Sequence, residues 1–512
     1  PYAIYGGLQD DGSWATMSFT RDVAGIRTGA DWKMHWDDGQ YAAVDPTNWR
    51  VIYSEGTNGT FRVVDPIGHT DSARKATPRN ITNFQQATGI APTAPDAAQA
   101  LRVNWTTPFI ISPHDPERVY YGTNYLLTTT DEGRHWTIVS PDLSKHDPNH
   151  NERGTGGLTP DSTGAEGYAT IYTISESPVT RGLIWAGTDD GNVWLTRDGG
   201  GHWTEVDRNI PDVPAGLWVS RIEASAAAPG TAYVTFDGHR SDNYQSWLFK
   251  TTDYGRHWTD LSPHLAKGHD GGAPVYCVLE DDKNPNLLFL GTEYGLEVSF
   301  DAGETWSWMD ANGLPTAAVY DAIIQPRDRD LIIATHGHGI FILDDITALE
   351  QWKPALAAQP VHVFAQRRAT LWVDMSHDGQ TASNVYGGEN PPDVRVPLPQ
   401  SLDREHIQNT PIITVGFGSE AMGEATLAIT SPGGQTRTVA IPARPGITRY
   451  AWDGHMEAPR ARGRGGRGAT GAGRYRPPAP LTPGTYRLKV TLGGATAAGS
   501  LEVRADPMAA SH

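Results

Sequence analysis

The sequence predicts an all-β protein: a seven-bladed β-propeller followed by a small immunoglobulin-like β-sandwich. A tight-turn motif recurs along the chain, short β-rich segments alternate with Gly, Pro and Asp, and helical periodicity is nearly absent. The 512 residues include 56 Gly and 37 Pro, which suits a chain built from many turns and short strands.

The repeated turn has the pattern Ser/Thr-x-Asp-x-Gly-x-x-Trp. Its hydroxyl and carboxylate can accept hydrogen bonds from turn N–H groups, and its Gly adopts backbone angles that a Cβ would penalise. Its Trp anchors the outgoing strand by burying a large apolar area. The copies are centred on Asp131, Asp198, Asp253 and Asp301. Identical spacing in all of them indicates a repeat architecture and gives these carboxylates a structural role.

Each copy belongs to a unit of about 45 residues with four antiparallel strands, the size of a propeller blade. Around Asp131 we expect strands at 109–112, 119–123, 125–129 and 136–139, with a turn at 114–118. The same template fits further units at 40–65, 171–203, 220–258, 275–306 and 319–345.

The N-terminus supplies part of a seventh unit. Residues 2–7 read as its second strand and residues 13–19 as its third, so its innermost strand is missing from the sequence. Either the C-terminal part closes the ring, or another polypeptide segment donates the strand. Donation by an upstream half or a separate chain is the favoured expectation, because the chain begins at Pro1 without Met, as a processed or truncated product would.

The predicted propeller ends at residue 349, after which the strand-and-turn repeat is no longer present. Residues 350–404 are expected to form a linker and irregular segment, and residues 405–506 the sandwich. Its strands are predicted at 412–417, 425–429, 436–441, 448–452, 485–492 and 500–503. The Arg/Gly-rich stretch 459–478 cannot pack a core and is expected to be a disordered loop, with binding of RNA or an acidic surface as the alternative.

Composition limits the function classes. The net charge of −18 argues against general nucleic-acid binding, which needs a basic footprint. No run of about 18 apolar residues exists, so no transmembrane helix is expected. Cys277 is the single cysteine, and its apolar surroundings predict a buried, inert thiol. No cofactor or metal is expected, since His336 and His338 lack a third ligand.

The turn motif resembles the Asp-box, or BNR repeat, of sialidases and sortilin. Segments 5–10, 112–116, 140–143, 334–337 and 388–392 are similar to the C-terminal half of large bacterial exported proteins. These are described as sortilin-like (VPS10-like) BNR-repeat proteins and are often labelled glycosyl hydrolases. The resemblance implies an extracellular, periplasmic or cell-surface location and an N-terminal propeller half upstream of this chain.

Strand alternation sorts the turns by face. The Asp-boxes share a face with the turns between first and second strands, while the second-to-third turns and the inter-blade loops form the opposite mouth, where propeller ligands usually bind. Asp10, Asp189 and Glu293 lie in second-to-third turns and are the catalytic candidates. Two carboxylates about 5–10 Å apart would suffice for glycoside hydrolysis. Alternatively, Asp-Gly is simply a preferred hairpin turn.

Trp105, Tyr168, Arg221 and His336 are the binding candidates near this mouth. Aromatic side chains there suit sugar stacking or peptide anchoring, and equally suit packing of a central channel. The leading functional prediction is a binding or scaffold module for a protein, peptide or glycan that docks with an upstream propeller half. The alternative is a glycoside hydrolase of the tandem-propeller type that uses mouth carboxylates.

Overall fold

The computed structural model describes residues 2–18, 26, 31–68, 73–78, 101–145, 167–266, 272–309, 314–371, 411–456 and 481–507. The chain divides into two compact units. The propeller unit comprises Tyr2–Ser18 and Gly29–Asp344, and the sandwich unit is built mainly on Asp345–His512. Of the predicted linker 350–404, residues 372–404 lie outside the described residues, as does the predicted Arg/Gly-rich loop 459–478.

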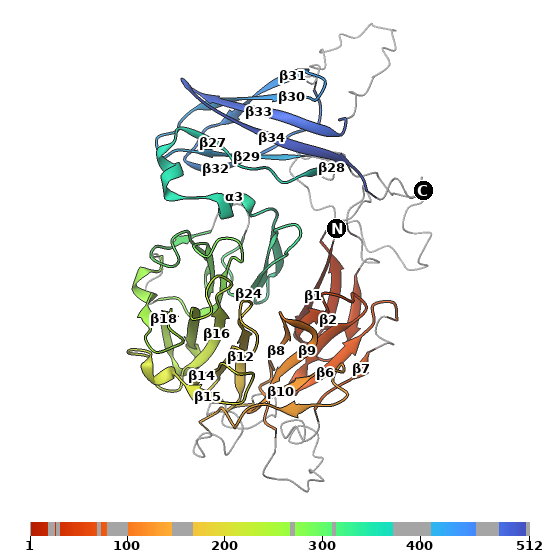
Figure 1. Cartoon of the computed structure of the whole chain (residues 1–512), viewed down its shortest axis with the longest axis vertical. Helices are drawn as coiled ribbons and strands as arrows, with labels where there is room; N and C mark the ends of the chain where they lie inside the picture. Colours follow the sequence, from red (N-terminus) through yellow and green to blue (C-terminus); the bar gives the residue numbers. More distant parts are fainter. Residues whose placement is uncertain are drawn as a thin grey trace. The chain divides into compact units, whose positions relative to one another are not determined.

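The described part of the propeller unit holds antiparallel sheets in chain order, five with four strands and two with three. We name them sheets A to G (Figure 1, red to green). Sheet A contains β1 (Ala3–Leu8), β2 (Gly12–Met17) and β3 (Trp32–His35); sheet B β4 (Gly39–Val44), β5 (Ile52–Gly56), β6 (Thr60–Val64) and β7 (Arg74–Lys75); sheet C β8 (Phe109–Ser112), β9 (Asp115–Gly122), β10 (Leu126–Thr129) and β11 (Thr137–Ile138).

Sheet D contains β12 (Ile171–Glu176), β13 (Ile184–Thr188), β14 (Val193–Thr196) and β15 (Trp203–Glu205); sheet E β16 (Trp218–Ala224), β17 (Ala232–Gly238), β18 (Asn243–Thr251) and β19 (Thr259–Asp260); sheet F β20 (Val275–Glu280), β21 (Leu288–Thr292), β22 (Gly295–Ser299) and β23 (Ser307–Trp308); sheet G β24 (Val319–Ile324), β25 (Leu331–Thr335) and β26 (Gly339–Leu343). Short 3₁₀ helices lie at Thr57–Gly59, Asp207–Asn209, His239–Ser241 and Ser262–His264. The predicted all-β propeller fold is confirmed; the number of blades in the complete ring stays a prediction.

Burial explains why the inner strands form. Every residue of β13 and of β21 is buried, as expected for strands covered on both faces by neighbouring sheets. Between sheets B and C the contact is aromatic: Phe61 is fully buried and its ring centroid lies 5.0 Å from Phe109 and 5.4 Å from Tyr121. Each sheet therefore buries its apolar faces against the next.

One boundary differs from the prediction. The turn expected at 114–118 is largely strand, since β9 begins at Asp115, which pairs with Ser112. The Asp115 carboxylate also accepts a hydrogen bond from Arg181 at 2.8 Å, so contacts with a neighbouring sheet hold this segment extended. A local sequence reading cannot supply that partner.

The sandwich unit packs two sheets around one core. One sheet has the order β27-β29-β32, and the other has the order β28-β34-β33-β30-β31 with β28 parallel to β34. The core includes Trp452 and Tyr486, and the Tyr486 hydroxyl donates to the carbonyl of Thr482 at 2.9 Å. The elements are α3 (Thr347–Gln351), a 3₁₀ helix (Pro354–Ala358), β27 (Val361–Val363), β28 (Ala369–Leu371), β29 (Ile412–Phe417), β30 (Glu424–Thr430), β31 (Thr436–Pro442), β32 (Gly446–Ala451), β33 (Gly484–Leu492) and β34 (Ala495–Ala505). The immunoglobulin-like topology stays a prediction.

Across the described segments, no helix is both long enough and apolar enough to cross a bilayer.

Candidate functional site

Hydrogen bonds between turns sort the propeller unit into two faces. On one face, the N–H of Gly199 donates to the carbonyl of Gly182 in the turn between β12 and β13. Gly199 lies in the repeated turn around Asp198, and the four repeated turns are called Asp-boxes below for the motif that they resemble. On the other, the N–H of Asp10, between β1 and β2, donates to Asp38 in the loop that joins sheets A and B. We call this second face the mouth face, and the site described below lies on it.

The Asp-boxes on the opposite face have one geometry. In the first box the Thr129 hydroxyl accepts from the N–H of Gly133 and donates to Asp131, which in turn accepts from the N–H of His135 at 2.9 Å. The same contacts recur around Asp198, Asp253 and Asp301. Hydrogen bonds from the following His lower the pKa of Asp198 and of Asp253 to about 2. These carboxylates are occupied in closing their own turns.

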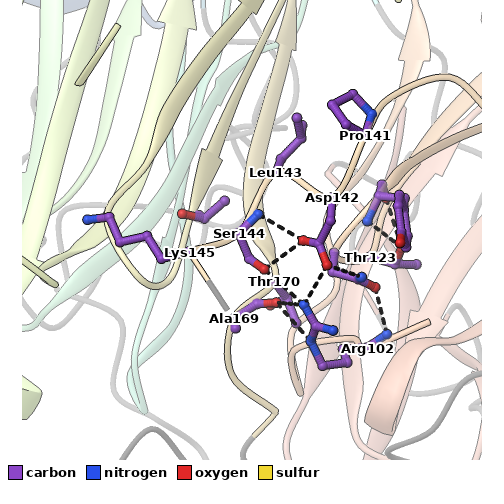
Figure 2. Close-up of polar contacts among 12 residues, drawn as sticks. Arg102, Thr123, Pro141, Asp142, Leu143, Ser144, Lys145, Ala169 and Thr170 are labelled. Carbon is purple, nitrogen blue, oxygen red and sulfur yellow. Dashed lines mark hydrogen bonds and ion pairs between the residues drawn. The ribbon is translucent and has the colours of Figure 1, made fainter. Parts of the chain in front are cut away.

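Asp142, which follows β11, connects the described ends of the two segments that were predicted as long loops, one before and one after sheet C. Asp142 accepts hydrogen bonds from Arg102 at 2.9 Å and from Asn124 at 2.8 Å, and Arg102 also donates to the carbonyl of Ala169 (Figure 2). Arg102 and Ala169 end these loops, most of whose residues lie outside the described ranges. This charged contact therefore fixes where both loops leave the mouth face.

A β-bulge recurs near the start of the first strands. The register shifts between Ile171 and Thr173, between Val275 and Cys277, and between Val319 and Asp321. Each bulge contains one tyrosine: Tyr172, Tyr276 or Tyr320. Bulges re-aim side chains, and here they bring tyrosines of three sheets together on the mouth side.

Two of these tyrosines form an aromatic cluster with His336, and Tyr172 makes a separate ring contact. Tyr276 stacks on Tyr320 with centroids 4.2 Å apart, and Tyr320 lies 5.0 Å from the ring of His336. Tyr172 meets Trp218 edge to face at 5.1 Å. Burial is the main cause that raises the pKa of Tyr320 to about 12 and that of Tyr276 still further, so both phenols are neutral donors at physiological pH.

Polar groups stand beside the aromatic cluster. The Tyr276 hydroxyl donates to Glu293 at 2.6 Å, and Arg240 lies over the Trp218 ring at 4.1 Å. Arg221 of sheet E donates to Asp321 of sheet G at 2.7 Å, which brings together the first strands of sheets that are not neighbours along the chain. Sites that orient a small ligand typically combine aromatic walls with a small number of placed polar groups.

Two acids of the propeller unit, Glu223 on β16 and Glu55 on β5, have raised pKa values. Burial raises the pKa of Glu223 to about 8, while Arg221 acts in the opposite direction. Glu55 is fully buried, its pKa is raised by burial, and it accepts from the N–H of Thr107. Side chains that titrate near neutral pH inside a site are candidates for function.

Large aromatic side chains are exposed at the rim of the mouth face. Trp36, in the loop between sheets A and B, is 75% exposed, and Tyr244, the second residue of the hairpin strand β18, is 52% exposed. Lys33 places Nζ 3.9 Å from the Trp36 ring centroid. One face of the ring therefore carries a cation and the other is free to stack on a ligand.

The structure separates the three candidate carboxylates. Asp10 lies in an exposed turn with a positive φ of 63°. Asp189 is fully buried and accepts from Thr170 and Asn104, and burial together with Asp190 raises its pKa to about 7. Glu293 is the one that reaches the aromatic cluster.

Of the binding candidates, His336 belongs to the cluster, and Arg221 donates to the backbone carbonyl of Tyr320 beside it. Trp105 is half-buried, with an indole N–H that has no partner among the described residues, and Tyr168 is half-buried at the end of a long loop. The sequence-based choice omitted Tyr172, Asp321 and Trp36. The dipeptide Val/Ile-Tyr at the start of first strands was the available signal for Tyr172. Within the described ranges no group of three or more His, Cys, Asp or Glu is placed to hold a metal ion.

No family model matches the chain. A probable oligoxyloglucan-reducing end-specific xyloglucanase of Neosartorya fischeri is 26% identical over 184 residues, which cover 35% of this chain and 20% of the relative. Among solved structures, a GH74 xyloglucanase from Xanthomonas campestris aligns over 66% of this chain and 49% of its own, with 17% identity and a TM-score of 0.44. PorZ, a surface component of the type-IX secretion system of Porphyromonas gingivalis, aligns over 92% and 59%, with 12% identity and a TM-score of 0.40. The chain thus spans a fifth of the curated relative and about half of these structures.

Proposed function

We propose that the chain is a binding module whose ligand is a glycan, held on the mouth face between the aromatic cluster and Trp36. The observation that carries the proposal is the recurrence of the bulge, which stacks Tyr276 on Tyr320 beside Glu293 and Arg221 and places Tyr172 against Trp218. Aromatic rings stack on sugar faces, and fixed donors and acceptors orient hydroxyl groups. The limited similarity to a xyloglucanase favours a glycan over a peptide.

The alternative is a glycoside hydrolase of the tandem-propeller type that uses mouth carboxylates. Two acids must face one sugar for that chemistry. The burial of Asp189 and its hydrogen bond from Thr170 argue against it as one of the two. Glu293 is the remaining candidate acid near the cluster, and Asp321 and Glu223 lie on neighbouring first strands. We further propose an exported bacterial protein in which this propeller docks with an upstream propeller half.

The test is to incubate purified chain 1–512 with a glycan array and with xyloglucan oligosaccharides, and to follow binding and product release together. A binding module retains oligosaccharides and leaves them intact. New reducing ends that disappear in a Glu293→Gln variant would establish the hydrolase instead. If no glycan binds and none is cleaved, the glycan proposal is wrong.

A further inference from the structure

Sheet A is built differently from its neighbours at one strand position. Its strand order is β1-β2-β3, so β1 forms the inner edge and pairs only with β2 among the described residues. β1 holds either the first strand position, as β8 does in sheet C, or the second, as β9 does.

Glycine contacts identify β1 as a second strand. In sheets D and F a second-strand glycine lies directly against the first strand of the next sheet: a Cβ on Gly187 would lie 2.4 Å from Val219, and one on Gly291 would lie 2.4 Å from Val319. Gly7 of β1 makes the same approach, since its Cβ would lie 2.0 Å from Gly39 in β4. β1 therefore occupies the second position, and the first position of sheet A is vacant in the described chain.

The vacant position leaves a core residue exposed. In sheets B and D to G one third-strand residue pairs with the fourth residue of the second strand, as Leu296 pairs with Gly291 and Ile340 with Ala334. In sheet C the corresponding pair is Leu126 with Gly122, because β9 is longer at its start. In sheets B to F this residue is at most 1% exposed: Phe61 0%, Leu126 0%, Val193 0%, Leu248 0% and Leu296 1%. In sheet G it is Ile340, which is 42% exposed.

The contact between sheets B and C shows which side chains cover the position equivalent to Ile340. Phe61 is covered by two residues of the following sheet, Phe109 from the first strand and Tyr121 from the second. For Ile340 the second-strand residue is Gly6, whose Cβ would lie 3.4 Å from the Ile340 Cδ1 atom. Gly6 has no side chain and the described residues place no first strand there, so none of them covers Ile340 as Phe109 covers Phe61.

We propose that sheet A accepts a β-strand from a partner polypeptide, added antiparallel to β1 in the first-strand position. Its residue opposite Gly6 is large and apolar and covers Ile340, as buried apolar residues do in the complete sheets. This inference deepens the docking part of the proposed function and is independent of the glycan ligand. It names what the docking partner supplies: an extended segment with an apolar anchor.

The experiment uses thiol labelling of Ile340→Cys, because the sole native thiol, Cys277, is buried. The chain is extended ahead of Tyr2 with a copy of residues 170–183, which carries the first strand of sheet D and its natural connection. The copied Ile174 then stands opposite Gly6. Linking the strand raises its effective concentration to the millimolar range. A control extension carries Ile174→Asp in the copy, and Ile138→Cys, 39% exposed on β11, controls for unrelated changes in labelling.

Chain 1–512 with Ile340→Cys is expected to label rapidly. The extension should slow this labelling about tenfold or more, as occupancy of one site by ligand at roughly ten times its dissociation constant would. The control extension and Ile138→Cys should show no slowing. If the Ile340→Cys thiol labels as slowly as Cys277 before the extension is added, the chain itself already covers Ile340 and the proposal is wrong. Unchanged labelling after extension, or protection that depends on protein concentration through pairing of two copies, would equally overturn the proposal.

Discussion

Trp36 offers the sharpest test of the proposed glycan site, because another largely exposed tryptophan lies on the other face. Trp36 is 75% exposed on the mouth face, whereas Trp49, in the turn between β4 and β5, is 62% exposed on the Asp-box face. Replacing either residue by Ala should change the free energy of unfolding by less than about 0.5 kcal/mol, as for most surface substitutions. Their effects on ligand binding should differ.

The expected loss follows from the area that the Trp36 ring can offer. A tryptophan contributes up to roughly 200 Å² of contact surface, and with 75% of Trp36 exposed roughly 150 Å² remains available. Lys33 lies over one ring face, so a sugar can cover about half of this area. At ~25 cal/mol per Å², burial of ~75 Å² contributes about 2 kcal/mol. Trp36→Ala should therefore weaken binding about 25-fold.

Isothermal titration with the tightest oligosaccharide from the array measures this effect, with melting temperature as the check on folding. Trp49→Ala should bind like the unaltered chain. The reasoning fails if Trp36→Ala binds normally, or if both variants lose affinity to the same extent, since the ligand would then not lie on the mouth face.

Three further predictions concern stability. The pKa of Asp198 is lowered to about 2, so its contribution to folding stability is present above pH of about 4 and is lost as the pH falls toward 2. Asp198→Ala should therefore lower the melting temperature at neutral pH and match the unaltered chain near pH 2. A difference in melting temperature that persists at low pH would contradict this. The raised pKa of Asp189, about 7, has the opposite sign: its contribution is complete below pH of about 4 and is lost as the pH rises through 7. Asp189→Asn should flatten that decline in a pH series of melting temperatures, and an unaltered decline would show that other groups cause it. In urea unfolding, Leu296→Ala should cost about 2–5 kcal/mol because it opens a closed cavity, and Ile340→Ala no more than about 1 kcal/mol because its site is already open; equal costs would contradict the vacant strand position.

The propeller fold could be predicted from the sequence because one turn motif and one strand pattern recur along the chain. The Asp-box hydrogen bonds are local, joining residues two to four apart, so the spacing of the motif is enough to predict them. Cys277 is buried as its apolar run predicted, and burial raises its pKa to about 12. In the sandwich unit, β29 to β33 were likewise expected, and β34 extends well beyond the predicted 500–503 because it pairs along all of β33. Two strands correct the predicted linker 350–404: β27 pairs with β29 and β28 with β34, so both belong to the sandwich.

The candidate site was only partly predictable. Asp189 and Glu293 occupy similar turns in the sequence, yet one is enclosed by Thr170 and Asn104 while the other contacts Tyr276. Those partners come from different strands and loops, and no local pattern specifies them.

The sequence by itself determined the all-β class, the repeated unit, the structural Asp-boxes and the burial of Cys277, because each depends on short-range spacing or on continuous apolar runs. Only the tertiary structure decided which side chains meet at the mouth face. Arg221 and Asp321 are 100 residues apart and belong to sheets that are not neighbours in the chain. A register shift of one residue re-aims each bulged tyrosine. Contacts of this kind depend on how whole sheets pack, and that arrangement is a property of the complete fold.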